Sequence, residues 1–468
     1  MNIHLIGVCG MGMGSLAGLL QQAGHRVSGC DTAFNPPMSE HLRQWGIATR
    51  PGFDPAHLDD RPDLVVVGNV CRRDNPEARR ALEMELEVKS FPQTLGELFI
   101  AGRRSVVVAG THGKTTTTCL LAHLLQAAGQ DPSFLAGGIM LDSGRSFRLG
   151  AGPHFVVEGD EYDSAFFDKR PKFVHYRPRV AVLTSLEYDH ADIYPDEESY
   201  RRAFDGLLEQ IPADGCLVAC HDQPGVRRLL AGRGLPVAWY GLEAEAEWQA
   251  ADLRPGPAGM SFSVVHRGRE VTRVQMPLSG RHNVANALAA LVVLERLGLE
   301  VDAVARHLSS FPGVARRLQV RGEVDGILVV DDFAHHPTEV RETVAAAARR
   351  FSGRQLVAVF EPRTNTSRRA VFQREYARAF AGASRVLLVP PFRAEQIEPQ
   401  QRFDSARLAA DLRAGGLEAE VLADAGAVID VLVRQLREPA VVLVMSNGPF
   451  DDIHQRLLEA LARRRGDR

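Results

Sequence analysis

A short glycine-containing loop restricts the possible folds of this chain more than any other stretch. It follows an apolar, β-branched run at residues 105–109 and precedes residues 115–128, where apolar side chains recur at helical spacing. The run predicts a buried parallel strand. A strand, a glycine turn and a helix in this order direct free backbone N–H groups and the positive end of the helix dipole at an anion. The stretch therefore predicts a phosphate-binding loop within an α/β domain.

The loop reads GTHGKT and is shorter than the common G-x-x-x-x-G-K-[ST] pattern. Lys114 can neutralise phosphate oxygens, and the hydroxyl group of Thr115 can reach a Mg²⁺ ion. The chain has only four lysines, so lysine abundance does not explain Lys114. The alternative is a glycine turn before a threonine-rich helix, with no ligand. Gly-Lys-Thr directly after a buried strand favours nucleotide phosphate, and we expect Lys114 on an exposed loop.

Strand-like and helix-like stretches alternate along the chain in three blocks. A length of 468 residues with 45% hydrophobic content suggests three domains, each with its own core. We place them at residues 1–103, 104–313 and 314–468. The alternation predicts an α/β fold of doubly wound parallel sheets, whose ligands lie at the carboxyl ends of strands.

Charge, hydropathy and cysteine usage argue against several classes of partner. A net charge of −3 gives no electrostatic footprint for nucleic acid, and no apolar run reaches the roughly 18 residues of a membrane span. The six cysteines lack a disulfide-framework spacing, which predicts free thiols in a reducing cytoplasm. Cys216, Cys220 and His221 could be metal ligands, but no second Cys/His pair completes a tetrahedral site. We expect a cytoplasmic protein with no nucleic-acid partner and no membrane insertion.

A second glycine turn lies near the N-terminus. Gly7, Gly10, Gly12 and Gly14 give G-x-x-G-x-G-x-G rather than the G-x-G-x-x-G order of a nicotinamide site. The predicted helix after the turn still favours a diphosphate, and Asp31, at the end of the next predicted strand, could accept a hydrogen bond from a ribose or a base. A turn whose glycines serve packing alone is the alternative.

Two further side chains follow predicted strands of the second block. Glu158 ends the run HFVVE, and His190 comes shortly after the run RVAVL. The carboxyl ends of parallel strands meet at one edge of a sheet, so both side chains should converge on the phosphate loop, where Mg²⁺ would bridge to the γ-phosphate. Charged side chains at strand ends are more often solvated when taken singly. Their joint placement favours metal ligation.

Motifs from all three blocks point to one family. They are GTHGKTTT, EGDEYD, EYDHADIY, GRHNVANA, the arginine pair after FPGVA, and DDFAHHPTEV. Together they resemble the Mur ligases, the ATP-dependent amide-forming enzymes of peptidoglycan synthesis, over essentially the whole chain. Within that family, DEYDSAFFDKRPKFVHYRP, EPRTNT and VMSNGPFDDIH are similar to the enzymes that attach a murein tripeptide rather than free L-alanine. Gly159 departs from the family, which usually has alanine there.

The resemblance implies an architecture and a reaction. A Rossmann-like N-terminal domain would bind the UDP-sugar, a central P-loop domain would bind ATP, and a Rossmann-like C-terminal domain would bind the peptide and complete the ATP site. ATP would phosphorylate a carboxylate, and an amine would then displace phosphate to form an amide. The implied substrates are UDP-N-acetylmuramate and L-alanyl-γ-D-glutamyl-meso-diaminopimelate, with Mg²⁺, in peptidoglycan recycling. The alternative is the ligase of de novo synthesis that adds free L-alanine.

The resemblance also assigns roles to individual residues. Catalysis falls to Lys114, Glu158 and His190, and Mg²⁺ ligation falls to Thr115, Glu158 and His190. Asn283 and Asn286 could instead be capping amides. The expected ATP contacts are Gly110, Thr111, His112, Gly113, Lys114, Thr115, Thr116, Asn283, Asn286, Arg317 and Asp332. The expected UDP-sugar contacts are Gly7, Gly10, Gly12, Gly14 and Asp31.

A tripeptide carries several carboxylates, so its site should hold more fixed positive charge than a site for alanine. The planar fork of arginine suits carboxylates, and Arg363 directly follows a predicted strand of the third block. Arg368 and Arg369 come shortly after it, although an arginine pair usually faces solvent. We expect Arg363 and Arg368 to bind the peptide.

Two functions of other classes stay open. One is an NAD(P)-linked dehydrogenase, against which the order of the N-terminal glycines speaks. The other is a nucleotide-switched binding protein that makes no amide. The pairing of a carboxylate with an imidazole, together with a complete third α/β block, favours a ligase over both.

Overall fold

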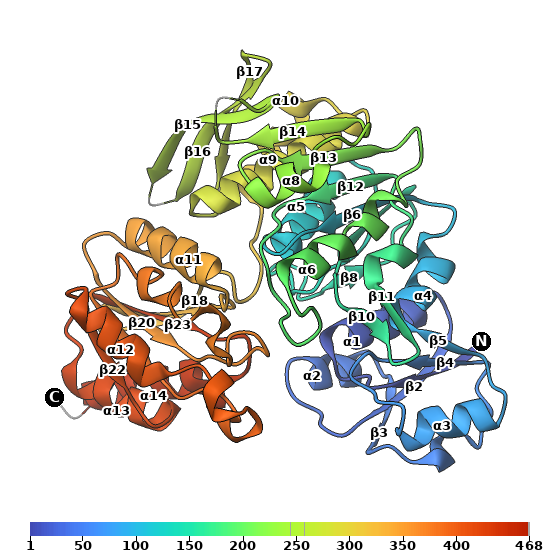
Figure 1. The fold of residues 1–468 in the computed structure, drawn as a ribbon, viewed down its shortest axis with the longest axis horizontal. Coiled ribbons are helices and arrows are strands. Elements are labelled where there is room, and N and C mark those ends of the chain that lie inside the picture. The colour runs from blue at the N-terminus through green and yellow to red at the C-terminus, as the bar shows by residue number, and fades with distance from the viewer. Residues whose placement is uncertain (244, 257, 467–468) are drawn as a thin grey trace.

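Three α/β regions, each built around one large sheet, make up the molecule. The computed structural model describes residues 1–243, 245–256 and 258–466 (Figure 1). Most strand pairs in the three large sheets are parallel, which confirms the predicted α/β class. A separate antiparallel hairpin of two short strands projects from the central region.

The first region is a five-stranded, fully parallel sheet in the order β3-β2-β1-β4-β5. Strand β4 reads LVVV and is buried throughout, because elements cover both of its faces. The elements are β1 (Asn2–Ile6), α1 (Met11–Gln22), β2 (Arg26–Asp31), α2 (Met38–Gln44), β3 (Ala48–Pro51), η1 (Pro55–Leu58), β4 (Leu64–Val67), α3 (Pro76–Glu83), β5 (Val88–Ser90), α4 (Phe91–Leu95) and η2 (Gly96–Ile100).

The central region is a ten-stranded sheet in the order β17-β16-β15-β14-β13-β12-β6-β9-β7-β8. Its middle is parallel, whereas β15, β16 and β17 form an antiparallel meander at one edge. The strands are β6 (Arg104–Ala109), β7 (Ser133–Leu135), β8 (Phe147–Arg148), β9 (His154–Gly159), β12 (Val180–Leu183), β13 (Cys216–Cys220), β14 (Val237–Gly241), β15 (Trp248–Gly256), β16 (Gly259–His266) and β17 (Arg269–Met276), with the hairpin β10 (Asp163–Ala165) and β11 (Asp168–Pro171).

Helices α5 and α9 contact each other over one face of the central sheet and bury their apolar residues in its largest core. Both helices begin within motifs that the sequence singled out, GTHGKTTT and GRHNVANA. The helices of the region are α5 (Lys114–Ala127), η3 (Lys172–His175), α6 (Glu197–Ala203), α7 (Asp205–Leu208), α8 (Pro224–Leu230), α9 (Arg281–Arg296), α10 (Val301–Ala305) and η4 (Arg306–Ser310).

The other face of the central sheet shares a continuous hydrophobic core with the first region. Helix α1 contacts β8, and the ring of Phe147 lies against Gly18 of α1. A Cβ atom on Gly18 would come within 2.0 Å of the Phe147 ring, so this close approach requires glycine. The first and central regions are therefore joined by packed apolar side chains.

The third region is a six-stranded sheet in the order β18-β19-β23-β20-β21-β22, with only β18 antiparallel to its neighbour. It has separate cores on its two faces. Its strands are β18 (Gln319–Val324), β19 (Ile327–Asp332), β20 (Gln355–Phe360), β21 (Arg385–Leu388), β22 (Glu418–Val421) and β23 (Ala440–Met445). Its main helices are α11 (Pro337–Arg350), α12 (Ser405–Ala414), α13 (Ala425–Gln435) and α14 (Ile453–Gly466), with short helical turns η5 (Ala370–Phe372), η6 (Tyr376–Arg378), η7 (Ala394–Gln396), η8 (Pro399–Gln401) and η9 (Phe450–Asp452).

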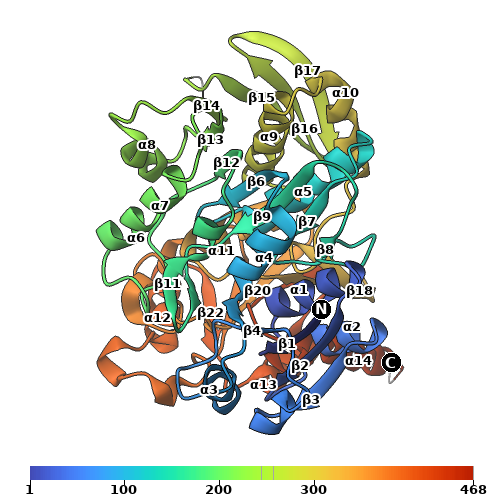
Figure 2. The ribbon, with the colours of Figure 1, turned by 90° about the vertical axis from the view of Figure 1, so that its right-hand side faces the viewer.

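The first and third regions lie side by side below the central region in Figure 1, and the view turned by 90° shows the third region behind the first (Figure 2). Helix α11 contacts α9 and β15 of the central region. The third region therefore meets the central sheet near the helix that carries Asn283 and Asn286.

Within the described part of the chain, no helix is long and apolar enough to cross a membrane. All six cysteines are free thiols.

Candidate active site

The phosphate loop lies at the carboxyl ends of β6 and β12. Gly110 and Gly113 have positive φ angles of 128° and 79°, which suit glycine. A Cβ atom on Gly110 would come within 2.3 Å of the Thr184 hydroxyl oxygen. The residues after β12 hold the loop, because Ser185 Oγ accepts a hydrogen bond from the His112 N–H at 2.8 Å and Thr184 Oγ1 donates to the His112 carbonyl at 2.6 Å.

Lys114 begins helix α5 and folds back into the loop. Its Nζ donates to the Gly110 carbonyl at 2.7 Å and to both carboxylate oxygens of Glu161, at 3.0 and 3.2 Å. The side chain is only 11% exposed, so the expectation of an exposed lysine is wrong. Burial opposes its charge, but the carboxylates of Glu161, Asp160 and Glu158 outweigh burial and raise the pKa of Lys114. The lysine is thus a fixed positive charge inside the loop.

Glu161 is one of the residues at this site that the sequence did not single out. Its fully buried carboxylate also contacts His190 Nε2 at 3.0 Å and the Tyr200 hydroxyl at 3.3 Å. Burial alone would raise its pKa, but Lys114 and His190 lower the pKa of Glu161 to about 2. The only signal in the sequence was the acidic run EGDEYD, whose individual carboxylates a linear pattern does not distinguish.

Thr115 and Glu158 place hard oxygen donors together. The Thr115 hydroxyl donates to Glu158 Oε1 at 2.9 Å, and the Gly137 N–H donates to Glu158 Oε2 at 2.6 Å. Partial burial, and then the nearby Asp160, raise the pKa of Glu158, so an added cation would favour its charged form. A hydroxyl group and a carboxylate are the kind of ligands that Mg²⁺ prefers, and these residues fit that ion.

His190 has a different environment from the other two expected metal ligands. Its backbone has a left-handed φ of 54°, and its Nε2 atom contacts Glu161 rather than Glu158. Burial lowers its pKa, but the hydrogen bond to Glu161 outweighs burial and the pKa of His190 is raised. Thr115 contacts Glu158 directly. His190 instead contacts Glu161, which in turn contacts Lys114, the residue before Thr115.

A cavity of about 490 Å³ lies between the central and third regions, beside the loop. This volume is within the usual range for small-molecule sites. Asn286 Nδ2 donates to Asn283 Oδ1 at 3.3 Å, and burial raises the pKa of Asp332 to about 6 although Arg317 opposes the shift. Seven of the expected ATP contacts line the cavity, namely His112, Gly113, Thr116, Asn283, Asn286, Arg317 and Asp332. The other four, Gly110, Thr111, Lys114 and Thr115, lie in the adjoining loop.

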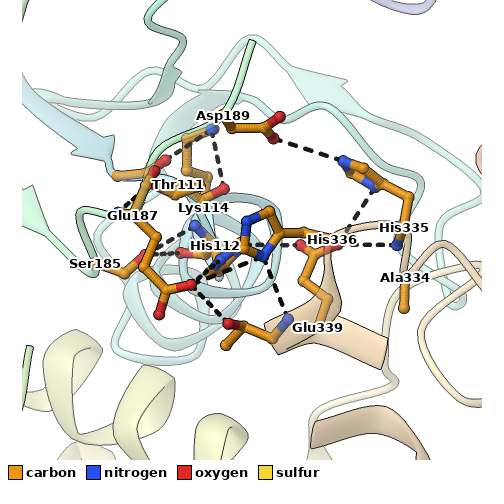
Figure 3. Close-up of polar contacts among 12 residues, drawn as sticks. Thr111, His112, Lys114, Ser185, Glu187, Asp189, Ala334, His335, His336 and Glu339 are labelled. Atoms are coloured by element: carbon orange, nitrogen blue, oxygen red, sulfur yellow. Dashed lines mark hydrogen bonds and ion pairs between the residues drawn. The ribbon is translucent and has the colours of Figure 1, made fainter. Parts of the chain in front are cut away.

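His112 joins the central region to helix α11 of the third region (Figure 3). One ring nitrogen lies 3.3 Å from Glu187, and the other lies 3.3 Å from Glu339 of α11. Thr338 Oγ1 also donates to Glu187 Oε2, at 2.6 Å. The loop histidine, expected only as a nucleotide contact, therefore also connects two regions.

A second set of contacts joins the segment after His190 to the third region. The Ala191 N–H donates to Thr366 Oγ1 at 3.3 Å, and Asn365 Nδ2 donates to Asp192 Oδ2 at 2.7 Å. These contacts place the turn that follows β20 beside the Glu161–His190 pair.

We expect the contact between the central and third regions to weaken at high pH. Burial lowers the pKa of His112, but hydrogen bonds to Glu187 and Glu339 outweigh burial and raise it to about 9. This pKa lies above the ordinary histidine value of about 6.5. The charged His112 ring therefore stabilises the contact fully below pH ~6.5, and this stabilisation is lost as pH rises through about 9. The facing His336 does not replace it, because burial lowers the pKa of that residue to about 4.

Small-angle X-ray scattering of the nucleotide-free protein measures this effect as a larger radius of gyration above pH ~9. The His112→Gln variant should give the larger value at every pH. An unchanged pH midpoint in that variant would show that another group controls the contact.

Arg363 and Arg368 both lie in the turn that follows β20. Arg363 Nη1 donates to Glu361 Oε1 at 3.0 Å, and its guanidinium carbon lies 3.7 Å from the centre of the Phe392 ring. Arg368 donates to Asn365 Oδ1 at 2.7 Å. Arg369 instead donates to Gln401 at 2.8 Å. The structure thus brings Arg363 and Arg368 to the turn that contacts the central region.

The N-terminal glycines have different roles in the fold. Gly7 has a positive φ of 84°, and a Cβ atom on Gly14 would come within 2.1 Å of the Met38 sulfur, so these two glycines serve the turn and packing. Gly10 and Gly12 have no neighbour closer than 3.6 Å to an added Cβ atom. Asp31 Oδ2 accepts from the Cys9 N–H at 2.9 Å and so holds the turn.

Three family profiles match the chain. They are "Mur ligase family, catalytic domain" over residues 2–103, "Mur ligase middle domain" over residues 108–294, and "Mur ligase, glutamate ligase domain" over residues 316–448. Together they extend over most of the chain and follow the order of the three sheets.

Individual relatives are similar over nearly the full length. A UDP-N-acetylmuramate–L-alanyl-γ-D-glutamyl-meso-2,6-diaminoheptandioate ligase from Haemophilus influenzae is 37% identical over 98% of this chain and 99% of its own. A UDP-N-acetylmuramate–L-alanine ligase from Kineococcus radiotolerans is 38% identical over 99% of this chain and 97% of its own. The crystal structure of a murein peptide ligase from Psychrobacter arcticus has a TM-score of 0.75 at 36% identity and covers 98% of both chains. The chain therefore belongs to the Mur ligase family.

Proposed function

We propose that this Mur ligase joins L-alanyl-γ-D-glutamyl-meso-diaminopimelate to UDP-N-acetylmuramate with the use of ATP, in peptidoglycan recycling in the cytoplasm. The observation that carries the proposal is the position of the phosphate loop. The loop borders the interdomain cavity through Gly113 and Thr116, so a nucleotide in the cavity brings its phosphates to Lys114. Arg363 and Arg368, which we expect to bind the peptide, lie in the turn after β20 that contacts the segment following His190.

The phosphate loop would position ATP. The N-terminal end of α5 supplies free N–H groups, and Lys114 supplies a positive charge that phosphate oxygens attract away from Glu161. Thr115 and Glu158 would hold Mg²⁺, which neutralises the charge on the β- and γ-phosphates. His190 and Tyr200 keep Glu161 hydrogen-bonded when Lys114 turns to phosphate.

The reaction would proceed in two displacements. A carboxylate oxygen of the N-acetylmuramyl group attacks the γ-phosphorus atom, the bond to the bridging oxygen breaks, and ADP leaves. The α-amino group of the peptide then attacks the acyl carbon, phosphate leaves, and the nitrogen loses a proton. Phosphate is a far better leaving group than a carboxylate oxygen, so the route divides one difficult substitution into two easier ones.

The first region would bind the UDP-sugar at the glycine turn before α1. A Cβ atom on Gly10 or Gly12 would make only ordinary van der Waals contacts, so packing does not account for these two glycines, and α1 adds the positive end of its dipole for a diphosphate. We assign this role to residues 1–103, ATP binding to residues 104–313, and peptide binding to residues 314–468. Asp31 would act mainly by holding the turn, because one of its oxygens already accepts the Cys9 N–H.

A ligase that adds free L-alanine is the second candidate function. Sequence identity to these relatives does not distinguish the two functions, since the tripeptide ligase is 37% identical to this chain and the L-alanine ligase is 38% identical. The segment DEYDSAFFDKRPKFVHYRP, which includes the β10–β11 hairpin, and the motif EPRTNT favour the tripeptide. The test is an ATP-dependent assay with UDP-N-acetylmuramate and either amine, followed by the mass of the product. Exclusive addition of alanine would decide for the second candidate.

Arg363 should contribute to recognition of the peptide carboxylates. We expect Arg363→Ala to weaken use of the tripeptide by about 1.5–3 kcal/mol, the scale of a hydrogen bond to a charged group. The affinity for ATP should stay unchanged. The measurement is kcat/KM for tripeptide and ATP. Arg369→Ala is the matched control, because Arg369 contacts Gln401 instead. Equal losses in the two variants would argue against a specific role for Arg363.

A further inference from the structure

Four side chains with metal-binding atoms meet in the first region, far along the chain from the phosphate loop. They are His4 on β1, Cys30 on β2, His57 on η1 and Glu77 on α3, and their ligand atoms all lie within 4.8 Å of one another. His4 is 1% exposed, and Cys30 and Glu77 are fully buried. None of the four was selected by the sequence motifs or has a role in the proposed reaction.

The cluster lies on the face of the first sheet that α3 and η1 cover. Alternate residues of β1 point to opposite faces, so Ile3 and Leu5 pack in the core with α1, whereas Ile6 packs with Cys30 in a separate small core. His4 shares the parity of Ile6. The four donors therefore come from four separate segments that only the folded sheet brings together.

His4 Nε2 is buried and has no hydrogen-bond partner, although it points into the cluster at 3.6 Å from Glu77 Oε2. Its other ring nitrogen, Nδ1, lies 2.9 Å from Ser28 Oγ. This arrangement orients the ring and leaves Nε2 for another contact, as in metal-ligating histidines. An unsatisfied buried nitrogen is costly, and a bound cation would remove that cost.

The other donors already converge on one point. Cys30 Sγ lies 2.6 Å from Glu77 Oε2, and Glu77 Oε1 contacts His57 Nδ1. The Asp54 N–H donates to the same oxygen of Glu77 at 3.0 Å and orients the carboxylate. One thiolate, one carboxylate and two neutral imidazoles form a ligand set that balances the charge of a divalent ion.

We propose that His4, Cys30, His57 and Glu77 form a structural site for a divalent transition metal, with Zn²⁺ as the best match. Thiolate and imidazole ligands select Zn²⁺ over Mg²⁺, which prefers oxygen. Four protein ligands leave no open position for a substrate, which is typical of a structural site. On binding, the Cys30 thiol releases its proton to solvent and the sulfur coordinates the metal.

A metal bound at this site would cross-link β1, β2, η1 and α3 beside the proposed sugar site. Cys30 precedes Asp31, whose carboxylate holds the Cys9 N–H of the glycine turn, and β1 leads directly into Gly7. Metal binding should therefore stabilise the fold and restrict the motion of the turn that would bind the UDP-sugar. This second effect rests on the proposed function, whereas the metal site itself does not.

The test uses the full-length protein, stripped with a chelator and then titrated with Zn²⁺ or Co²⁺. We expect one tightly bound Zn²⁺ per chain, a higher unfolding temperature, and a thiolate-to-cobalt charge-transfer band with Co²⁺. Cys30→Ser should keep the hydrogen bond to Glu77 but lose the band and weaken Zn²⁺ binding by more than the ~10–100-fold that loss of an outer-shell partner costs. His57→Gln, at the most exposed of the four positions, should also weaken binding.

Cys71→Ser is the matched control, because Cys71 is a buried thiol of the same small core but lies outside the four donors. It should bind Zn²⁺ and Co²⁺ like the parent. Absence of tight Zn²⁺ binding in the parent would overturn the proposal, and so would equal affinities in the parent and Cys30→Ser. Cobalt binding without the charge-transfer band would place the ion at a thiolate-free group such as His112, Glu187 and His336 and would also overturn it.

Discussion

Replacing Lys114 with alanine should lower amide formation by about 10³-fold or more, the range found for charged groups that stabilise phosphoryl transfer. The lysine places a positive charge inside the phosphate loop, and it is held there by the Gly110 carbonyl and Glu161. The measurement is single-turnover formation of ADP and amide at saturating ATP.

Lys114→Ala also breaks the buried ion pair with Glu161, so it should change stability as well as activity. Removal of one partner of a buried ion pair costs roughly 3–5 kcal/mol, because the other charge is left uncompensated. We therefore expect a lower unfolding temperature in Lys114→Ala and a partial recovery of that temperature, without activity, in the double variant Lys114→Ala/Glu161→Gln. Lys169→Ala, at a lysine that is 68% exposed, is the control for loss of a lysine. Normal turnover by folded Lys114→Ala would refute the proposed ATP site.

Glu158 and Glu161 are three residues apart, yet their substitutions should have different effects. Glu158 contacts Thr115, whereas Glu161 contacts Lys114 and His190. We expect Glu158→Gln to raise the Mg²⁺ concentration for half-maximal activity by about 10-fold or more, because an amide is a poorer ligand for a hard cation than a carboxylate. Glu161→Gln should lower kcat and leave that Mg²⁺ concentration nearly unchanged.

His190→Ala discriminates between two roles for the imidazole. If His190 acts mainly by fixing Glu161, the variant should shift the Mg²⁺ requirement less than Glu158→Gln does and should lower kcat. Titrations of activity with Mg²⁺ at saturating ATP measure both quantities. A shift in His190→Ala as large as that in Glu158→Gln would make the imidazole a direct metal ligand, and parent-like titrations in both variants would contradict the metal assignment.

Local patterns were sufficient to predict the phosphate loop and its flanking elements. The predicted strand before the loop is β6, and the predicted helix after it is α5. These predictions succeed because a buried parallel strand needs a continuous apolar run, and because a turn with positive φ angles requires glycine at Gly110 and Gly113. Burial of Lys114 was not predictable in this way, since it depends on Glu161, which lies 47 residues away.

The sequence by itself determined the alternation of strands and helices, the glycine turns and the family motifs, because each depends on residues close together in the chain. Only the tertiary structure decided which carboxylate meets which cation, that His112 connects two regions, and that the first and central regions share a core. The cluster of His4, Cys30, His57 and Glu77 shows the difference most clearly, since its four residues are far apart in the sequence and form no recognisable motif. Contacts of this kind depend on strand register and on the packing of separate segments, which short-range patterns do not encode.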